Sequence, residues 1–161
     1  MLFLQLINRN NMRLVIQRVS RASVTIDGVV KSSIGQGLMV LVGVEHGDTL
    51  DDVKWLVGKT TALRIFDDEN GVMNRSVVDV DGEVLAVSQF TLTASTRKGN
   101  RPSYIRAAGH DVAVPLYEAY CEQVSNVINK ETQRGVFGAD MKVELINDGP
   151  VTIIIDSKLK E

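Results

Sequence analysis

Most of the apolar residues of this chain lie in short runs with the character of β-strands. Residues 37–44, GLMVLVGV, are continuously apolar and β-branched, which is typical of a buried central strand. Residues 13–20 and 23–26 alternate in polarity, and the Asp-Gly pair at 27–28 predicts a tight hairpin into the following VVKSSI. The chain is therefore expected to open as an antiparallel sheet.

Three further β-type segments follow. Residues 83–94, EVLAVSQFTLTA, are predicted to form another buried strand. Near the C-terminal end, MKVELI and VTIIID are interpreted as two strands separated by NDGPVT, whose last two residues open the second strand. Proline removes a ladder donor and glycine weakens a strand interior, so Gly149 and Pro150 predict a turn, a bulge or a functional element.

Two segments have helical periodicity. The first begins after Asp48 or Thr49, either of which is a suitable N-cap, and the second is predicted over about residues 111–130, with Pro115 in its first turn. The apolar stripes expected to face the core are Leu50, Val53, Leu56, Val57 and Leu63 in the first helix, and Leu116, Tyr120, Val124, Val127 and Ile128 in the second.

These elements predict an α+β fold with a mostly antiparallel, two-layer or barrel-like β-sheet core and two helices packed on one side. A chain of 161 residues is long enough for one such core. The strand signals begin just after Met12, so residues 1–11 are interpreted as an N-terminal extension outside the fold and residues 12–161 as a single domain. A chain started at Met12 is expected to fold.

Composition excludes several classes of function. The formal net charge of -2 argues against binding nucleic acid through overall positive charge, although a local basic patch remains compatible with it. A single cysteine, Cys121, suits a reducing compartment, and no Cys/His spacing predicts a metal site. His46 and His110 lie far apart and neither has a recognisable nucleophile context. No run approaches the length of a membrane span.

Besides NDGPVT, two segments are poorly explained by packing alone. In SQFTL the polar residues Ser88, Gln89 and Thr91 interrupt an apolar run. They are interpreted either as a strand end whose hydroxyls bond to local backbone, which the pattern alone favours, or as the floor of a pocket to which Phe90 adds an aromatic face.

The second segment is the basic loop that follows. It gathers Arg97, Lys98, Arg101 and Arg106 around Tyr104, which suits either a solvated loop or a single-stranded RNA end. Pattern alone favours the solvated loop, because clustered surface charges are common.

The order of these segments resembles one known family. The segments that carry the likeness are MRLVIQRVSRASV at 12–24, SQFTL at 88–92, RPSY at 101–104, FGADM at 137–141 and NDGPVT at 147–152. They are similar to the D-aminoacyl-tRNA deacylases, also called D-tyrosyl-tRNA deacylases, of the Gly-cisPro type, and the likeness extends over residues 12–156.

The resemblance implies a cytoplasmic hydrolase that cleaves the ester of D-aminoacyl-tRNA, and of glycine mischarged on tRNA-Ala, without a metal or an organic cofactor. It implies a homodimer in which Gly149 and Pro150 of one subunit enter the active site of the other. A cis peptide there would direct both carbonyls at the space that an L side chain needs, so that selection works by exclusion. Arg18 and Asn147 are expected to hold this segment in place.

The catalytic roles implied by the resemblance are assigned as follows. Thr91 is a doubtful nucleophile because the sequence offers it no adjacent base. Instead, the 2'-hydroxyl of the terminal adenosine is expected to help activate water, while backbone amides around Phe90 and Thr91 bind the oxyanion and Ser88 and Gln89 shape the pocket. Contacts to tRNA are expected from Arg97, Lys98, Arg101, Phe137 and Met141.

Two alternatives remain open. The first is a related deacylase that clears L-alanine from a noncognate tRNA, against which Arg18 and NDGPVT argue. The second is a noncatalytic RNA-binding module that uses only the basic loop and its aromatic residue.

Overall fold

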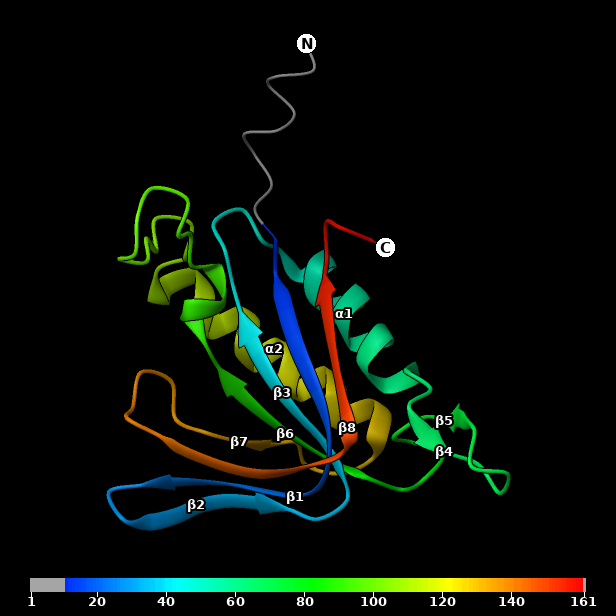
Figure 1. Cartoon of the computed structure of the whole chain (residues 1–161). Helices are drawn as coiled ribbons and strands as arrows, with labels where there is room; N and C mark the ends of the chain where they lie inside the picture. Colours follow the sequence, from blue (N-terminus) through cyan, green and yellow to red (C-terminus); the bar gives the residue numbers. More distant parts are fainter. Residues whose placement is uncertain (1–10, 161) are drawn as a thin grey trace.

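The computed structural model describes residues 11–160, which form a curved sheet with two helices on one side (Figure 1). The elements in chain order are β1 (Arg13–Ile26), β2 (Val29–Ile34), β3 (Gly37–Gly43), α1 (Leu50–Ala62), β4 (Phe66–Asp67), β5 (Met73–Arg75), β6 (Glu83–Ser88), the 3-10 helix η1 (Phe90–Thr93), α2 (His110–Ile128), β7 (Gln133–Arg134) and β8 (Lys142–Asp156).

Strand β1 organises the sheet because it pairs with three other strands. It is antiparallel to β8 along almost its whole length, while its other edge pairs first with β3 and then with β2. The sheet continues from β3 to β6 and β7 through parallel pairings, so it is mixed although mostly antiparallel. The predicted hairpin between β1 and β2 is confirmed, with positive φ at both Asp27 and Gly28.

The core has two parts, one on each side of the curved sheet. The larger part lies between the sheet and the helices, where Tyr120 of α2 is fully buried and its hydroxyl lies 2.9 Å from that of Thr60 in α1. The smaller part lies within the curve of the sheet and includes Val24, Met39 and Leu85. This arrangement confirms the predicted α+β fold with a barrel-like core and two helices on one side.

Helix α1 begins where the sequence predicts. Thr49 is its N-cap and forms a capping box with Asp52, so both the side-chain hydroxyl and the carboxylate bond to backbone amides of the first turn. Two residues of the predicted buried stripes are nevertheless exposed: Leu50 in α1, at 59%, and Val127 in α2, at 49%. Leu50 is the first residue of α1. Val127 lies at the margin of the apolar face of α2, since Val124 and Ile128 on either side of it are buried.

Two strand predictions need correction. The strand predicted over residues 83–94 ends at Ser88, and the chain turns into η1, because Gln89 already departs from the extended conformation and the next residues coil. The two strands predicted around NDGPVT are one strand, β8, which is interrupted by a bulge. Gln17 of β1 pairs with Thr152 while Val19 pairs with Asn147, so four residues of β8 lie opposite Arg18 alone.

The predicted extension at residues 1–11 falls mostly outside the described part of the chain. Asn11 is described: it is buried, and its backbone N–H donates to Glu45 Oε2 over 2.7 Å. None of the helices in the described part is long and apolar enough to cross a membrane.

The start of the β3–β6 pairing gives a stability prediction. A Cβ on Gly37 would lie 1.8 Å from the backbone oxygen of Glu83, the residue paired with it, so Gly37→Ala must push the two strands apart. We expect the free energy of unfolding, measured by urea denaturation, to fall by about 2 kcal/mol or more.

The matched control is Gly58→Ala. Gly58 lies within α1 and a Cβ there would have no neighbour within 4 Å, so this variant should gain about 0.5–1 kcal/mol of stability from helix propensity. Equal stability of Gly37→Ala and the wild type would contradict the geometry described for β3 and β6.

Candidate active site

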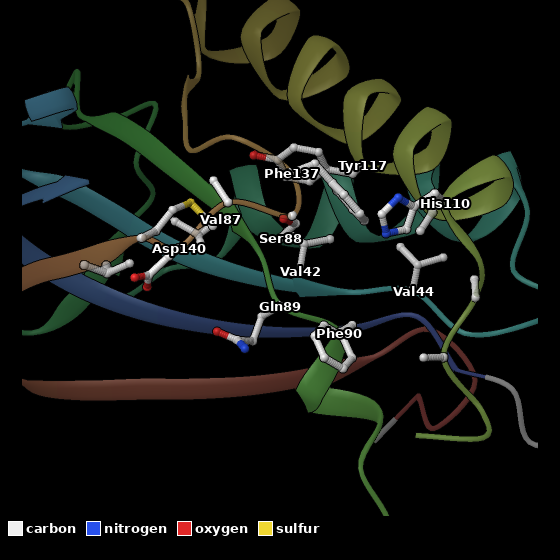
Figure 2. Close-up of a pocket in the computed structure, with 17 residues that line it drawn as sticks. Val42, Val44, Val87, Ser88, Gln89, Phe90, His110, Tyr117, Phe137 and Asp140 are labelled. Atoms are coloured by element: carbon white, nitrogen blue, oxygen red, sulfur yellow. The ribbon is translucent and has the colours of Figure 1, made fainter. Parts of the chain in front are cut away.

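A cavity of about 590 Å³ opens between the end of β6, the start of α2 and the segment that leads into β8 (Figure 2). Its lining is mostly apolar with a few polar groups, which is the usual composition of a small-molecule site. The lining residues include Ser88, Gln89, Phe90, His110, Tyr117, Phe137 and Met141.

One wall is the turn from β6 into η1. Gln89 donates its backbone N–H to Val42 O over 2.8 Å, which ties the turn to β3. The next two amides, those of Phe90 and Thr91, begin the 3-10 helix and have no acceptor among the described residues. The turn therefore has two free backbone donors, one of them on Phe90, which lines the cavity.

The opposite wall is built by α2 and the segment before β8. The rings of His110, the first residue of α2, and Phe137 pack edge to face at 5.0 Å between centroids, and Tyr117 lies two turns further along the helix (Figure 2). The Tyr117 hydroxyl donates to Ala86 O over 2.8 Å, and burial raises the pKa of this phenol above its ordinary value. Tyr117 is therefore a neutral wall residue at physiological pH.

The structure brings together residues from two of the singled-out segments. Ser88, Gln89 and Phe90 face the same cavity as Phe137 and Met141, although about fifty residues separate the two segments.

Thr91 does not line the cavity. Its hydroxyl oxygen accepts a hydrogen bond from the Gln89 side-chain amide at 2.5 Å, so the hydroxyl is directed toward the turn itself. Arg97, Lys98 and Arg101 are exposed on the loop beyond η1 and do not line the cavity either.

Sequence reasoning missed His110 and Tyr117. The position of His110 beside Phe137 depends on how α2 packs on the sheet, and no local pattern distinguishes it from a surface histidine. Tyr117 was not among the residues of the apolar stripe predicted for the second helix, and periodicity does not distinguish a core residue from a cavity wall.

The bulge in β8 is held by side chains on both sides. Asn147 spans it, since its Oδ1 accepts from the Val151 N–H and its Nδ2 donates to Thr152 Oγ1, both over 2.9 Å. From β1, the Arg18 guanidinium donates to Asp148 O over 2.8 Å and to Ile65 O over 2.7 Å, and its side chain is only 11% exposed.

The Gly149–Pro150 peptide bond within this bulge is cis, as expected from the resemblance. Neither residue lines the cavity of its own chain.

The comparisons with known proteins decide the family. The family model described as D-Tyr-tRNA(Tyr) deacylase matches residues 15–156. This chain belongs to that family. Two relatives named D-aminoacyl-tRNA deacylase, from Parabacteroides distasonis and Flavobacterium johnsoniae, are 65% and 59% identical to it over 150 residues, which are 93% of this chain and the full length of each relative.

Two solved structures share the fold of this chain. A structure titled c-Myc DNA Unwinding Element Binding Protein is 42% identical, with a TM-score of 0.85, and the match covers 89% of this chain and 97% of that one. A probable eukaryotic D-amino acid tRNA deacylase shares the fold with a TM-score of 0.78 at 18% identity, over 91% of this chain and 99% of that one.

Beside the cavity, this family member buries a cluster of carboxylates. Glu45, Asp48 and Asp52 are each less than 9% exposed, and Lys158 lies 3.9 Å from Asp48 and 3.7 Å from Asp52. Burial raises the pKa of Asp48 to about 7, repulsion from Asp52 and Glu45 adds to the rise, and the Glu45 amide and Lys158 oppose it. Within residues 11–160 no group of acidic, histidine or cysteine side chains has the geometry of a metal site.

The raised pKa of Asp48 predicts a pH-dependent stability. Between about pH 4 and pH 7 the folded protein binds a proton at Asp48 that the unfolded chain has released, so this contribution is complete below the unfolded pKa and is lost as the pH rises through 7. In Asp48→Asn, whose side-chain oxygen can still accept from the Glu45 N–H, we expect unfolding free energies to fall less from pH 4 to pH 7.5 than in the wild type. Identical pH profiles for the two proteins would contradict the raised pKa.

Proposed function

We propose that this protein hydrolyses the ester bond between a D-amino acid and the terminal adenosine of tRNA, and that it also removes glycine mischarged on tRNA-Ala. The observation that carries the proposal is the family match over residues 15–156, which includes the SQFTL wall and the Phe137 and Met141 wall of one cavity. The reaction belongs to the cytoplasm, where charged tRNA is used. It needs no metal or organic cofactor in this proposal.

The protein's part in catalysis is to position groups and stabilise charge. The free amides of Phe90 and Thr91 are suited to bind the oxygen that becomes negative when water attacks the ester carbonyl. Thr91 is a poor nucleophile, because the hydrogen bond recorded for its hydroxyl comes from the Gln89 amide, which is not a base. In the absence of a protein base, the 2'-hydroxyl of the terminal adenosine helps to activate the attacking water.

This mechanism predicts a small effect for Thr91→Ala and a large effect of the substrate's 2'-hydroxyl. Loss of the Thr91 hydroxyl should lower kcat for D-Tyr-tRNA by at most about tenfold, roughly 1.4 kcal/mol, because only the orientation of Gln89 changes. A substrate ending in 2'-deoxyadenosine should be hydrolysed at least about a hundredfold more slowly.

The control for the substitution is Thr96→Ala, whose side chain is exposed and does not line the cavity. A loss of several orders of magnitude in Thr91→Ala would make Thr91 the nucleophile. Full activity on the deoxy substrate would remove the 2'-hydroxyl from the mechanism.

Selection for the D-configuration is assigned to Gly149 and Pro150 acting across a homodimer. Neither residue lines the cavity of its own chain. Rejection of L-aminoacyl groups by these two residues therefore requires that the β8 bulge of a second copy reach the cavity. The segment is suited to a fixed obstacle, since Arg18 and Asn147 hold its backbone by hydrogen bonds. An obstacle made of backbone rejects an L side chain because it cannot rotate aside.

Exposed apolar side chains on β8 support the proposal that a second copy of the chain packs there. Ile146 and Ile154, on the two sides of the bulge, are 45% and 66% exposed, and no described strand pairs with the outer edge of β8. A long edge strand with exposed isoleucines is unfavourable in a monomer, so covering it with a second copy would bury apolar surface.

The exposed cations beyond η1 are assigned to the tRNA. Arg97, Lys98 and Arg101 lie on the loop that is closed by the pairing of Ser95 with Ser103, and Phe90 contacts Tyr104 edge to face at 5.0 Å at the base of this loop. Their charge suits the phosphates of the acceptor end, while Phe137 and Met141 suit the terminal nucleoside.

Comparative hydrolysis of D-Tyr-tRNA, Gly-tRNA and L-Tyr-tRNA tests both the function and the filter. The wild type should cleave the first two and leave the third intact. In Gly149→Ala, a Cβ would lie 2.9 Å from Arg18 Nη2 in a backbone conformation with φ of +138°, so the segment must move. The ratio of D-Tyr to L-Tyr hydrolysis should then fall at least about tenfold.

The control is Gly71→Ala, which also alters a glycine with positive φ but lies in the turn before β5. Cleavage of L-Ala-tRNA in place of D-Tyr-tRNA by the wild type would favour the L-alanine deacylase. Binding of tRNA without release of any amino acid would favour the alternative that the protein is a noncatalytic RNA-binding module.

A further inference from the structure

The carbonyl end of η1 is contacted by two arginines from distant parts of the chain. Arg13 Nη1 donates to Leu92 O over 3.2 Å, and Arg106 Nη2 donates to Thr93 O over 3.1 Å. The last carbonyls of a helix lack intrahelical donors and carry partial negative charge, so two guanidinium groups satisfy them well. One arginine comes from the start of β1 and the other from the segment before α2.

A buried carboxylate holds each arginine. Arg13 Nε lies 3.0 Å from Asp156 Oδ1, and the two residues are opposite each other in the pairing of β1 with β8. Arg106 Nε lies 3.7 Å from Glu45 Oε1, and Glu45 is only 2% exposed. Arg13 Nε donates a hydrogen bond to Asp156, whereas the contact of Arg106 Nε with Glu45 is an ion pair without a hydrogen bond. A carboxylate removed from water attracts a neighbouring cation more strongly than a surface group does, so both guanidinium groups are held beside their carboxylates.

The length of η1 connects its two ends. The helix has four residues, so its C-terminal carbonyls are only a few ångströms from the amides of Phe90 and Thr91 at its start. Thr93, which is 1% exposed, adds a link because its hydroxyl donates to Phe90 O over 2.8 Å. A displacement at the carbonyl end therefore changes the direction of the Phe90 and Thr91 amides.

We propose that Glu45 and Asp156 are positioning residues for the deacylation, acting through Arg106 and Arg13 on the carbonyl end of η1. The catalytic consequence rests on the proposed function, because it assumes that the Phe90 and Thr91 amides bind the oxyanion. Neither carboxylate touches the cavity. Their effect is to keep the donors at the distance and angle that charge stabilisation requires.

The pairing of Glu45 with Arg106 also joins the catalytic turn to the basic loop. The Arg106 carbonyl accepts from the His46 N–H over 3.0 Å, and the neighbouring Ala107 pairs with Glu45. A competing explanation is that Arg106, whose side chain is 39% exposed, contacts tRNA directly. Substitution of Glu45 separates the two explanations because it leaves the positive charge of Arg106 in place.

Glu45→Gln in the full chain is the decisive variant. With D-Tyr-tRNA as substrate, we expect kcat to fall about tenfold while KM changes less than twofold. If Arg106 acted only by attracting RNA, kcat would be unchanged and KM would stay equal or fall. Arg106→Lys should reproduce the loss in kcat. Lysine keeps the positive charge but lacks the planar guanidinium group, so it cannot contact Glu45 and Thr93 O at the same time.

A double-mutant cycle checks that the two residues act as a unit. The variant with both Glu45→Gln and Arg106→Lys should have a kcat no lower than that of Arg106→Lys alone. A kcat lowered by the product of the two single effects would contradict the coupling. Asp156→Asn tests the second arginine by the same kcat measurement. The matched control is Glu69→Gln, which removes a carboxylate paired with Arg75 at 2.7 Å in the β4–β5 turn and should leave kcat and KM unchanged.

A measurement independent of activity completes the test. The amide resonances of Phe90 and Thr91 in nitrogen-15 NMR spectra should shift in Glu45→Gln and Asp156→Asn and stay in place in Glu69→Gln. Unshifted resonances, or wild-type kcat in the folded variants, would overturn this inference. Absence of hydrolysis by the wild type would instead refute the proposed function, and the resonances would still report whether the carboxylates position η1.

Discussion

The pairing of β1 with β8 is the interaction on which the rest of the structure depends. β1 lies between β8 on one edge and β3 with β2 on the other, so its register determines where three strands stand relative to one another. The same register sets Arg13 opposite Asp156 and Arg18 opposite the bulge of β8. A shift of one residue would turn both arginines to the other face of the sheet.

Backbone groups, more than reactive side chains, provide the polar chemistry of the cavity. The turn after β6 offers two free amides. The bulge in β8, which lies outside the cavity of its own chain, is a backbone segment held by Arg18 and Asn147. Cys121, the one thiol of the chain, is buried, and its pKa is raised to about 11, so it takes no part. Such a site depends on how accurately the surrounding fold holds the main chain.

Local signals in the sequence were reliable where short-range physics dominates. The Asp27–Gly28 hairpin and the Thr49 cap follow from turn and capping preferences that involve only neighbouring residues. The strand predicted through SQFTL was wrong because periodicity does not distinguish a strand end from a single 3-10 turn. Leu50 and Val127 were assigned to the core because periodicity indicates which face of a helix is apolar, but not which residues at the margin of that face are covered.

The sequence by itself determined the α+β class, the family resemblance and the segments SQFTL, FGADM and NDGPVT that carry it, because these depend on residue types and their order. Only the tertiary structure decided that SQFTL and FGADM share one cavity, that His110 stands in its wall, and that Gly149 and Pro150 lie outside it. It also decided that Glu45 and Asp156 hold the two arginines behind η1. The physical reason is that these contacts join residues far apart in the chain, and strand register and helix packing, which no local pattern encodes, bring them together.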